Sequence, residues 1–117
     1  MNIPAPARRW LERASRNVRL TRRLPERFGA RPLCVSPAAA LGYYRRLDCG
    51  AWDELYAFAA HCVTAHATVW DVGASMGVFA FAAAHVASRS GRVLAVEADT
   101  WTVECLKQSA RNRPLDA

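Results

Sequence analysis

The sequence predicts an α/β fold, with helices in its N-terminal half and a small parallel sheet in its C-terminal half. Two observations support this prediction. The apolar content is rich in alanine, which favours helices. In the last fifty residues, apolar runs alternate with helical patterns, as they do where helices cover the strands of a parallel sheet. The expected order is strand 68–72, glycine loop 73–77, helix 78–88, strand 92–97 and helix 100–111.

The length and composition are those of one small globular domain. A chain of 117 residues buries roughly 60 to 70% of its unfolded surface. Its 52% hydrophobic and 22% charged residues exclude a wholly disordered chain. No apolar run approaches the ~18 residues of a membrane span, and the N-terminus lacks the apolar core of a secretory signal. We therefore expect no membrane span and a cytoplasmic location.

The cysteines and histidines predict neither a disulfide framework nor a metal site. No C-x-x-C spacing occurs among the four cysteines, which are Cys34, Cys49, Cys62 and Cys105. We expect free thiols. Because His61 and His66 fall on different faces of a helix, they make a poor zinc set with Cys62.

Charge is divided unevenly along the chain. Residues 1–47 hold eleven arginines and two glutamates, a balance of +9, whereas residues 48–117 hold five basic and eight acidic side chains, a balance of −3. Such asymmetry is typical of a basic arm that meets nucleic acid or an anionic membrane surface, or of a solvated helix face.

Residues 1–30 are expected to form a basic amphipathic helical arm. Arginines fill the positions between apolar residues spaced three and four apart, which are Trp10, Leu11, Ala14 and Val18. One apolar stripe of this size more often docks on its own domain than on lipid or RNA, so we expect it to dock. The aromatic residues interleaved in single-strand binders are almost absent here.

Residues 31–67 are expected to form a helical lead-in to a C-terminal unit at residues 68–117. After a short extended segment at 33–35, a helix is predicted at about 37–46. A second helix is predicted to start near Asp53. Its buried face is expected to contain Leu55, Phe58, Ala59 and Cys62.

The loop after the first C-terminal strand has the composition of a nucleotide-cofactor site. Its small residues let the backbone turn sharply and approach a ligand closely. The dinucleotide fingerprint G-x-G-x-x-G is not met, because Ser75 and Val78 stand at its second and third glycine positions. At the end of the next strand, Glu97 has two oxygens suited to the hydroxyls of a ribose. This combination favours a nucleoside cofactor without a pyrophosphate.

The stretches Val-Trp-Asp-Val-Gly-Ala-Ser-Met-Gly at 69–77 and Gly-Arg-Val-Leu-Ala-Val-Glu-Ala-Asp at 91–99 resemble the S-adenosylmethionine-dependent methyltransferases of the FkbM type. The resemblance covers residues 31 to about 112. It implies a partial Rossmann-like parallel sheet, the first β-α-β-α of a class I methyltransferase, with S-adenosyl-L-methionine as cofactor. It also implies methyl transfer to a hydroxyl oxygen of a sugar or another small metabolite.

The resemblance implies a role for each residue of the loop. Asp71 is expected near the methionine end of the cofactor, and Glu97 at the ribose hydroxyls. A close backbone approach is expected at Gly73, Ala74, Ser75 and Gly77, with Ser75 standing where asparagine is usual. Catalytic residues, the methyl acceptor and the oligomeric state are not identified by the sequence.

This chain departs from the resembled pattern in three places. Ala98 replaces a usual proline, and residues 65–67 replace a usual Gly-Asp turn. The resembled sheet has seven strands, of which this chain supplies about the first two, so both outer edges are expected to be unpaired. We expect an N-terminal portion of a methyltransferase that is inactive alone.

Two other functions compete with this expectation. In one, the chain is a small basic nucleic-acid-binding module, in which residues 1–31 contact nucleic acid and the βαβα unit is scaffold. In the other, it is a nicotinamide enzyme, which would need a glycine at the position of Val78.

Overall fold

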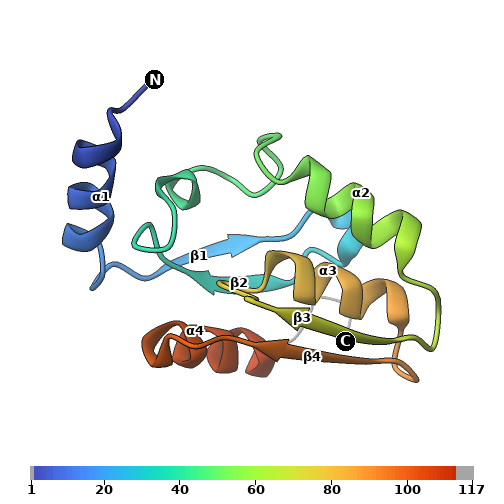
Figure 1. Cartoon of the computed structure of the whole chain (residues 1–117). Helices are drawn as coiled ribbons and strands as arrows, with labels where there is room; N and C mark the ends of the chain where they lie inside the picture. The colour runs from blue at the N-terminus through green and yellow to red at the C-terminus, as the bar shows by residue number, and fades with distance from the viewer. Residues whose placement is uncertain (1, 113–117) are drawn as a thin grey trace.

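The structure is a computed structural model that describes residues 2–112 (Figure 1). Met1 of the predicted arm and residues 113–117 of the predicted C-terminal unit lie outside the described residues. Within them, helices and strands alternate along the chain, except that η2 is followed directly by α2. The elements are α1 Ala5–Ala14, β1 Leu20–Arg23, η1 Glu26–Phe28, β2 Pro32–Val35, η2 Leu41–Tyr44, α2 Asp53–Cys62, β3 Thr68–Val72, α3 Val78–Ala87, β4 Arg92–Val96 and α4 Thr100–Arg111.

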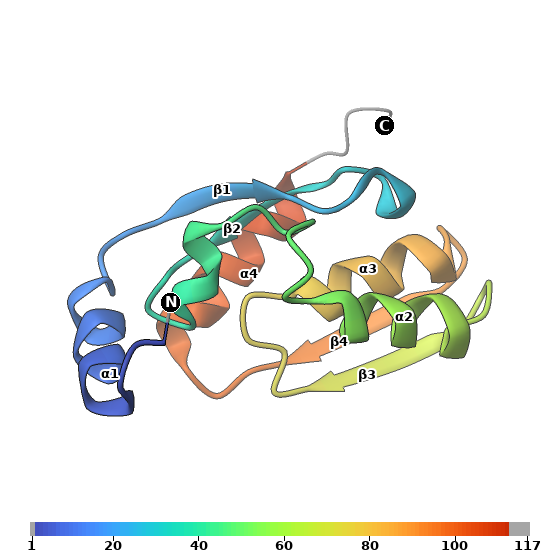
Figure 2. The same cartoon turned by 90° about the horizontal axis from the view of Figure 1, so that it is seen from above.

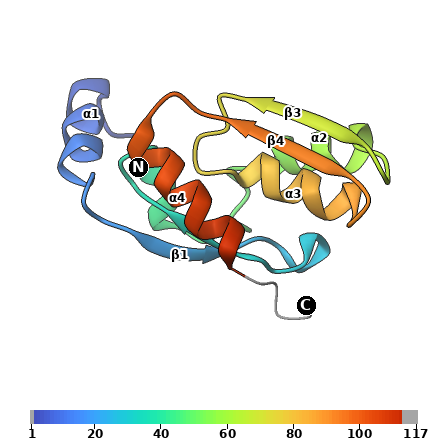
Figure 3. The ribbon, with the colours of Figure 1, turned by 90° about the horizontal axis from the view of Figure 1, so that it is seen from below.

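The C-terminal half confirms the predicted α/β arrangement with a parallel pair of strands. β3 and β4 pair in parallel, with Thr68 opposite Arg92 and Val72 opposite Val96, and lie side by side in Figure 3. α3 connects them and packs against both, while α2 packs on α3. β3 and α4 have the predicted bounds, whereas α3 and β4 each end one residue earlier than expected.

The N-terminal helix is shorter than the sequence predicted. α1 ends at Ala14, and residues 20–23 form strand β1, which pairs antiparallel with β2. The Ser15 hydroxyl donates a hydrogen bond to the carbonyl oxygen of Leu11, a local bond that competes with helix continuation. The pairing of β1 with the buried strand β2 then overrides the helical spacing that extended to Val18.

The prediction of a helix at 37–46 is wrong. Only the 3-10 helix η2, Leu41–Tyr44, forms there. The Ser36 hydroxyl accepts a hydrogen bond from the Ala38 backbone N–H and donates one to the carbonyl oxygen of Ser15, which holds a turn. Burial of Tyr43 and Leu47 fixes the rest of this segment in an irregular path.

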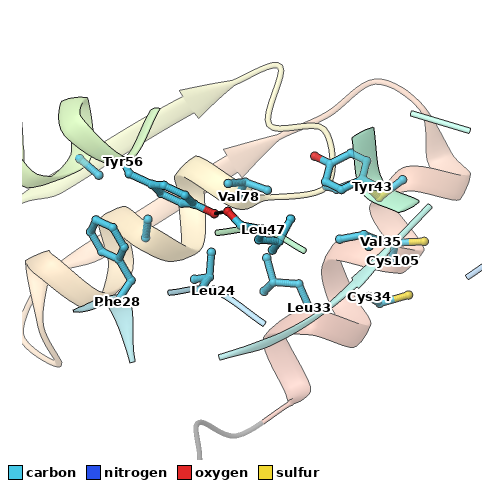
Figure 4. Packing of buried hydrophobic residues seen from close by; sticks show 13 residues of the cluster. Leu24, Phe28, Leu33, Cys34, Val35, Tyr43, Leu47, Tyr56, Val78 and Cys105 are labelled. Carbon is cyan, nitrogen blue, oxygen red and sulfur yellow. Dashed lines mark hydrogen bonds between the residues drawn. The ribbon is translucent and has the colours of Figure 1, made fainter. Parts of the chain in front are cut away.

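One apolar core joins both halves of the chain (Figure 4). Leu24 and Phe28, from the predicted arm, are buried in it. The ring of Phe28 lies 5.3 Å from that of Tyr56 on α2, and the Tyr56 hydroxyl donates a 2.9 Å hydrogen bond to the carbonyl oxygen of Leu47. Residues 20–30 therefore belong to the packed body of the molecule.

The buried face of α2 differs from the predicted one. Of the predicted residues, Ala59 is buried, whereas Leu55, Phe58 and Cys62 are exposed; Tyr56 and Val63 are buried in their place. Both sets have helical spacing. Contact with Phe28 and Leu47 places the Tyr56 side of the helix inward.

Hydrogen bonds connect α4 with the N-terminal pair of strands, β1 and β2. The Arg31 guanidinium donates hydrogen bonds to the carbonyl oxygens of Ser109 and Ala110. The Ser109 hydroxyl accepts one from the Cys34 backbone N–H at 2.8 Å. These bonds connect the last described helix with β2.

Replacing Tyr56 by phenylalanine should lower the free energy of unfolding by about 1 to 2 kcal/mol, because the carbonyl oxygen of Leu47 then loses its hydrogen bond. Urea denaturation followed by circular dichroism measures this change. Tyr44→Phe is the comparison variant, since Tyr44 is exposed and its hydroxyl lies 3.2 Å from that of Ser15 in a partly buried contact, so this change should cost less stability. Equal stability of Tyr56→Phe and the wild type would contradict the assigned role of this bond.

Candidate functional site

The predicted cofactor loop lies at the carboxyl ends of the two parallel strands. The backbone N–H groups of Gly73 and Ala74 both donate to the carbonyl oxygen of Val96, at 2.8 and 3.0 Å. That of Gly77 donates to the carbonyl oxygen of Ala74 at 3.0 Å. The loop is therefore tied to the end of β4 before it enters α3.

Glu97 closes the loop from the neighbouring strand. Its carboxylate accepts hydrogen bonds from the backbone N–H groups of Ser75, at 2.8 Å, and Asp99, at 3.1 Å. These bonds lower the pKa of the Glu97 carboxyl, and the bond from the Asp99 backbone has the largest effect. Two carboxylate oxygens offer about four acceptor positions, so Glu97 keeps capacity for two further donors.

Asp71 has an unsatisfied oxygen beside this loop. Among the described residues, no group donates a hydrogen bond to its buried Oδ2 atom. Burial, and secondarily the charge of Glu97, raise the pKa of the Asp71 carboxyl. Buried polar atoms usually have partners, so an unsatisfied one with a raised pKa is typical of a functional position.

The glycines at the two ends of the loop have different surroundings. Both have positive φ angles, +79° at Gly73 and +86° at Gly77. A Cβ atom at Gly77 would lie 2.7 Å from Leu106 and 2.8 Å from Phe81, whereas one at Gly73 would meet nothing within 4 Å. Gly77 therefore serves the packing of α3, and Gly73 borders open space.

Two hollows meet at the loop. One, of about 390 Å³, has Glu97, Asp99 and Trp101 on the strand side and Arg9, Arg13 and Arg16 on the side of α1; we call it the arginine hollow. The other, of about 400 Å³, is lined by Asp71, Gly73 and aromatic side chains; we call it the aromatic hollow. Ser75 lines both.

The structure thus brings Asp71, Gly73, Ala74, Ser75 and Glu97 together around one loop. Gly77 lies in the same loop but is buried. The sequence prediction missed the other walls of the hollows. Tyr43, Phe58 and Phe79 line the aromatic hollow, and the Phe58 and Phe79 rings lie 5.6 Å apart.

Asp99 is a further residue that the prediction missed. Its Oδ2 accepts hydrogen bonds from the backbone N–H and the hydroxyl of Thr102, which caps α4. Its Oδ1 lies 3.3 Å from the Arg16 guanidinium. An aspartate directly before a predicted helix was the available signal.

Metal and disulfide chemistry have no support in residues 2–112. No group of three histidine, cysteine, aspartate or glutamate side chains there has the arrangement of a metal site, and the four cysteines are free. Within the same part of the chain, every helix is too short or too polar to traverse a bilayer.

Comparisons with family models, with curated proteins and with solved structures find no match to this chain. Inferences about its function therefore depend on the residues and geometry described above.

Gly77→Ala should destabilise the protein more than Gly73→Ala. Both substitutions place a Cβ at positive φ, which costs about 1 kcal/mol. Only that at Gly77 collides with Leu106 and Phe81, and such overpacking adds about 1 to 3 kcal/mol. Thermal and urea unfolding measure the difference, and equal losses for the two variants would contradict the packing role of Gly77.

Asp71→Asn should stabilise the protein at neutral pH. A carboxyl whose pKa is raised on folding contributes stability below its unfolded pKa of about 3.9 and loses it as the pH rises through the folded pKa. The gain of the variant over the wild type should therefore shrink as the pH falls from about 7 to about 4. Urea denaturation across this range measures it, with Asp48→Asn, at an exposed carboxylate that pairs with Arg46, as control. A gain independent of pH would contradict the burial of charge.

Proposed function

We propose that the chain is an S-adenosylmethionine-dependent methyltransferase whose cofactor-binding portion includes residues 68–112. The observation that carries the proposal is the position of Glu97, whose carboxylate lies against the Ser75 backbone where the arginine hollow and the aromatic hollow meet. In this interpretation, β3, α3, β4 and α4 are the first β-α-β-α of a partial Rossmann-like sheet.

The residues present fit this cofactor. Glu97 has acceptor capacity for two ribose hydroxyls. The open space beside Gly73 suits close approach of a ligand to the backbone. The unsatisfied oxygen of Asp71 suits the positively charged end of the cofactor, because a nearby cation favours an ionised carboxylate.

The hydrogen bonds of the loop argue against a dinucleotide. A pyrophosphate needs free backbone N–H groups, whereas those of Gly73, Ala74, Ser75 and Gly77 all donate within the protein. Val78 is buried in the core. The loop therefore offers side-chain acceptors, which suit hydroxyl groups better than phosphates.

Methyl transfer would depend on the reactivity of the bound cofactor and on the position of the acceptor relative to it. S-adenosylmethionine supplies a methyl group on a positively charged sulfur, and transfer to a hydroxyl oxygen depends mainly on holding the two reactants in line. Asp71, Gly73 and Glu97 would hold the cofactor. The aromatic hollow, next to Asp71, offers apolar walls for the ring of a sugar or another small acceptor.

Nucleic-acid binding, the alternative function, has weaker support. Several arginines that it would use already have partners. Arg16 pairs with Asp99, Arg19 contacts Gln108, and both guanidiniums lie over the Trp101 ring. The cofactor proposal uses polar groups that have remaining capacity.

Glu97→Gln should weaken binding of S-adenosylmethionine, because an amide has one oxygen where the carboxylate has two. Gly73→Asp should also weaken it, since aspartate tolerates positive φ and its side chain would occupy the space beside the loop. Isothermal titration calorimetry of the full chain with S-adenosylmethionine measures both effects.

Glu104→Gln is the matched control, because Glu104 is an exposed residue of α4 paired only with Lys107. Unchanged affinity in both Glu97→Gln and Gly73→Asp, with native circular dichroism, would refute the proposed cofactor site. Loss of affinity in Glu104→Gln would point to a nonspecific effect.

A further inference from the structure

The exposed apolar face of α2 lines the aromatic hollow. Tyr56 and Ala59 of this helix are buried in the core, whereas Leu55 and Phe58 line the hollow and are 42% and 56% exposed. Large apolar side chains that gather at a hollow and stay uncovered mark a binding surface. The second apolar face of α2 is therefore available to a ligand.

Trp10 on α1 is another exposed apolar side chain outside the core. No residue of α1 is buried, and Trp10 is 68% exposed. The expectation that the apolar stripe of α1 docks on its own domain is therefore wrong for Trp10. Nothing in residues 2–112 shows what would cover this side chain. The aromatic hollow differs, because polar groups of the candidate site stand at one side of it.

The aromatic hollow lies between two helices and the loop that follows β3. Phe58 of α2 and Phe79 of α3 line it, and their rings lie 5.6 Å apart. In Figure 2, α2 and α3 lie side by side, with the loop at their N-terminal ends. A dry apolar cavity of about 150 Å³ holds a benzene ring. The hollow, of about 400 Å³, therefore has room for a molecule of one or two rings.

Hydrogen-bonding groups occupy only part of the wall of this hollow. Its polar side chains are those of Tyr43, Asp71 and Ser75. The backbone N–H groups of residues 73–75 already donate within the protein. The remaining wall consists of apolar side chains from α2 and from the start of α3, which are Leu55, Phe58, Val78 and Phe79. Among the described residues, a ligand hydroxyl that faces these two helices finds no hydrogen-bond partner.

This distribution of polar groups disfavours a sugar. A sugar ring carries hydroxyls around its edge, so some of them would face Leu55, Phe58 and Phe79. A hydroxyl that leaves water without gaining a partner weakens binding, and an apolar pocket disfavours one added hydroxyl by about 100-fold. A flat apolar ring with a single hydroxyl avoids this loss, because the hydroxyl can lie at Asp71 while the ring packs on the phenylalanines.

We propose that the methyl acceptor is a phenolic hydroxyl on a molecule of one or two rings, with the rings against Phe58 and Phe79 and the hydroxyl at Asp71. This inference rests on the proposed function. In the transfer, the phenolic oxygen forms a bond to the methyl carbon while the bond from that carbon to sulfur breaks, and the electron pair of the broken bond stays on the sulfur. The hydroxyl proton passes to the Asp71 carboxylate. Burial raises the pKa of this carboxyl, which makes it a stronger base than an exposed aspartate.

The test is isothermal titration calorimetry of the full chain with 2-naphthol and with methyl glucoside, each in the presence of S-adenosylmethionine. 2-Naphthol carries a single hydroxyl on apolar rings, whereas methyl glucoside carries hydroxyls around its ring. 2-Naphthol should bind more tightly, by about tenfold or more. The affinity of the chain for S-adenosylmethionine alone is measured in the same way.

Phe58→Ala should weaken binding of 2-naphthol by about tenfold, because the naphthol rings lose an aromatic contact. The variant should keep its native circular dichroism, since Phe58 is exposed. Trp10→Ala is the matched control. Trp10 is also an exposed aromatic residue of a helix, and it does not line the aromatic hollow.

Two results would overturn the inference about the acceptor. These are binding of methyl glucoside that equals or exceeds that of 2-naphthol, and equal losses of 2-naphthol affinity in Phe58→Ala and Trp10→Ala. Binding of 2-naphthol that depends on Phe58, in a chain that does not bind S-adenosylmethionine, would instead refute the proposed function on which the acceptor role rests.

Discussion

The carbonyl oxygen of Val96 and the carboxylate of Glu97 together hold the glycine loop across the ends of the parallel strands. The first accepts the N–H groups of Gly73 and Ala74, and the second accepts that of Ser75. These three bonds fix where the chain turns from β3 into α3. The positions of both hollows and of Asp71 depend on that turn, so one short cluster of backbone bonds organises the candidate site.

The same bonds determine which ligands the site favours. A loop with free amides attracts phosphates, but here the amides of Gly73, Ala74, Ser75 and Gly77 are engaged, and the carboxylate of Glu97 keeps acceptor capacity. Asp71 and Glu97 are held close enough for the charge of Glu97 to raise the pKa of Asp71. Two neighbouring carboxylates of this kind favour a ligand that brings hydroxyl donors and positive charge.

The sequence predicted those parts of the fold that local signals determine. Gly73 follows β3 and Gly91 precedes β4, so the bounds of these strands were readable to within a residue. The clustering of Asp71, Gly73 and Glu97 followed from strand ends meeting at one sheet edge.

Tertiary contacts decided the features that the sequence did not predict. Strand pairing ended α1 early, burial of Tyr43 replaced a helix, and two helical faces of α2 could not be ranked without the position of Phe28. The space available for a side chain at Gly77, unlike that at Gly73, is limited by Leu106, which lies far along the chain.

One face of the parallel sheet bears on how the protein behaves in concentrated solution. Trp70 lies opposite Leu94, and Val72 lies opposite Val96, so the four side chains share a face, and all four are exposed. Among the described residues, β3 and β4 each pair along one edge only. An apolar strand surface with open backbone edges is where chains add to one another. Self-association through this face should increase with concentration and with temperatures at which the hydrophobic effect strengthens.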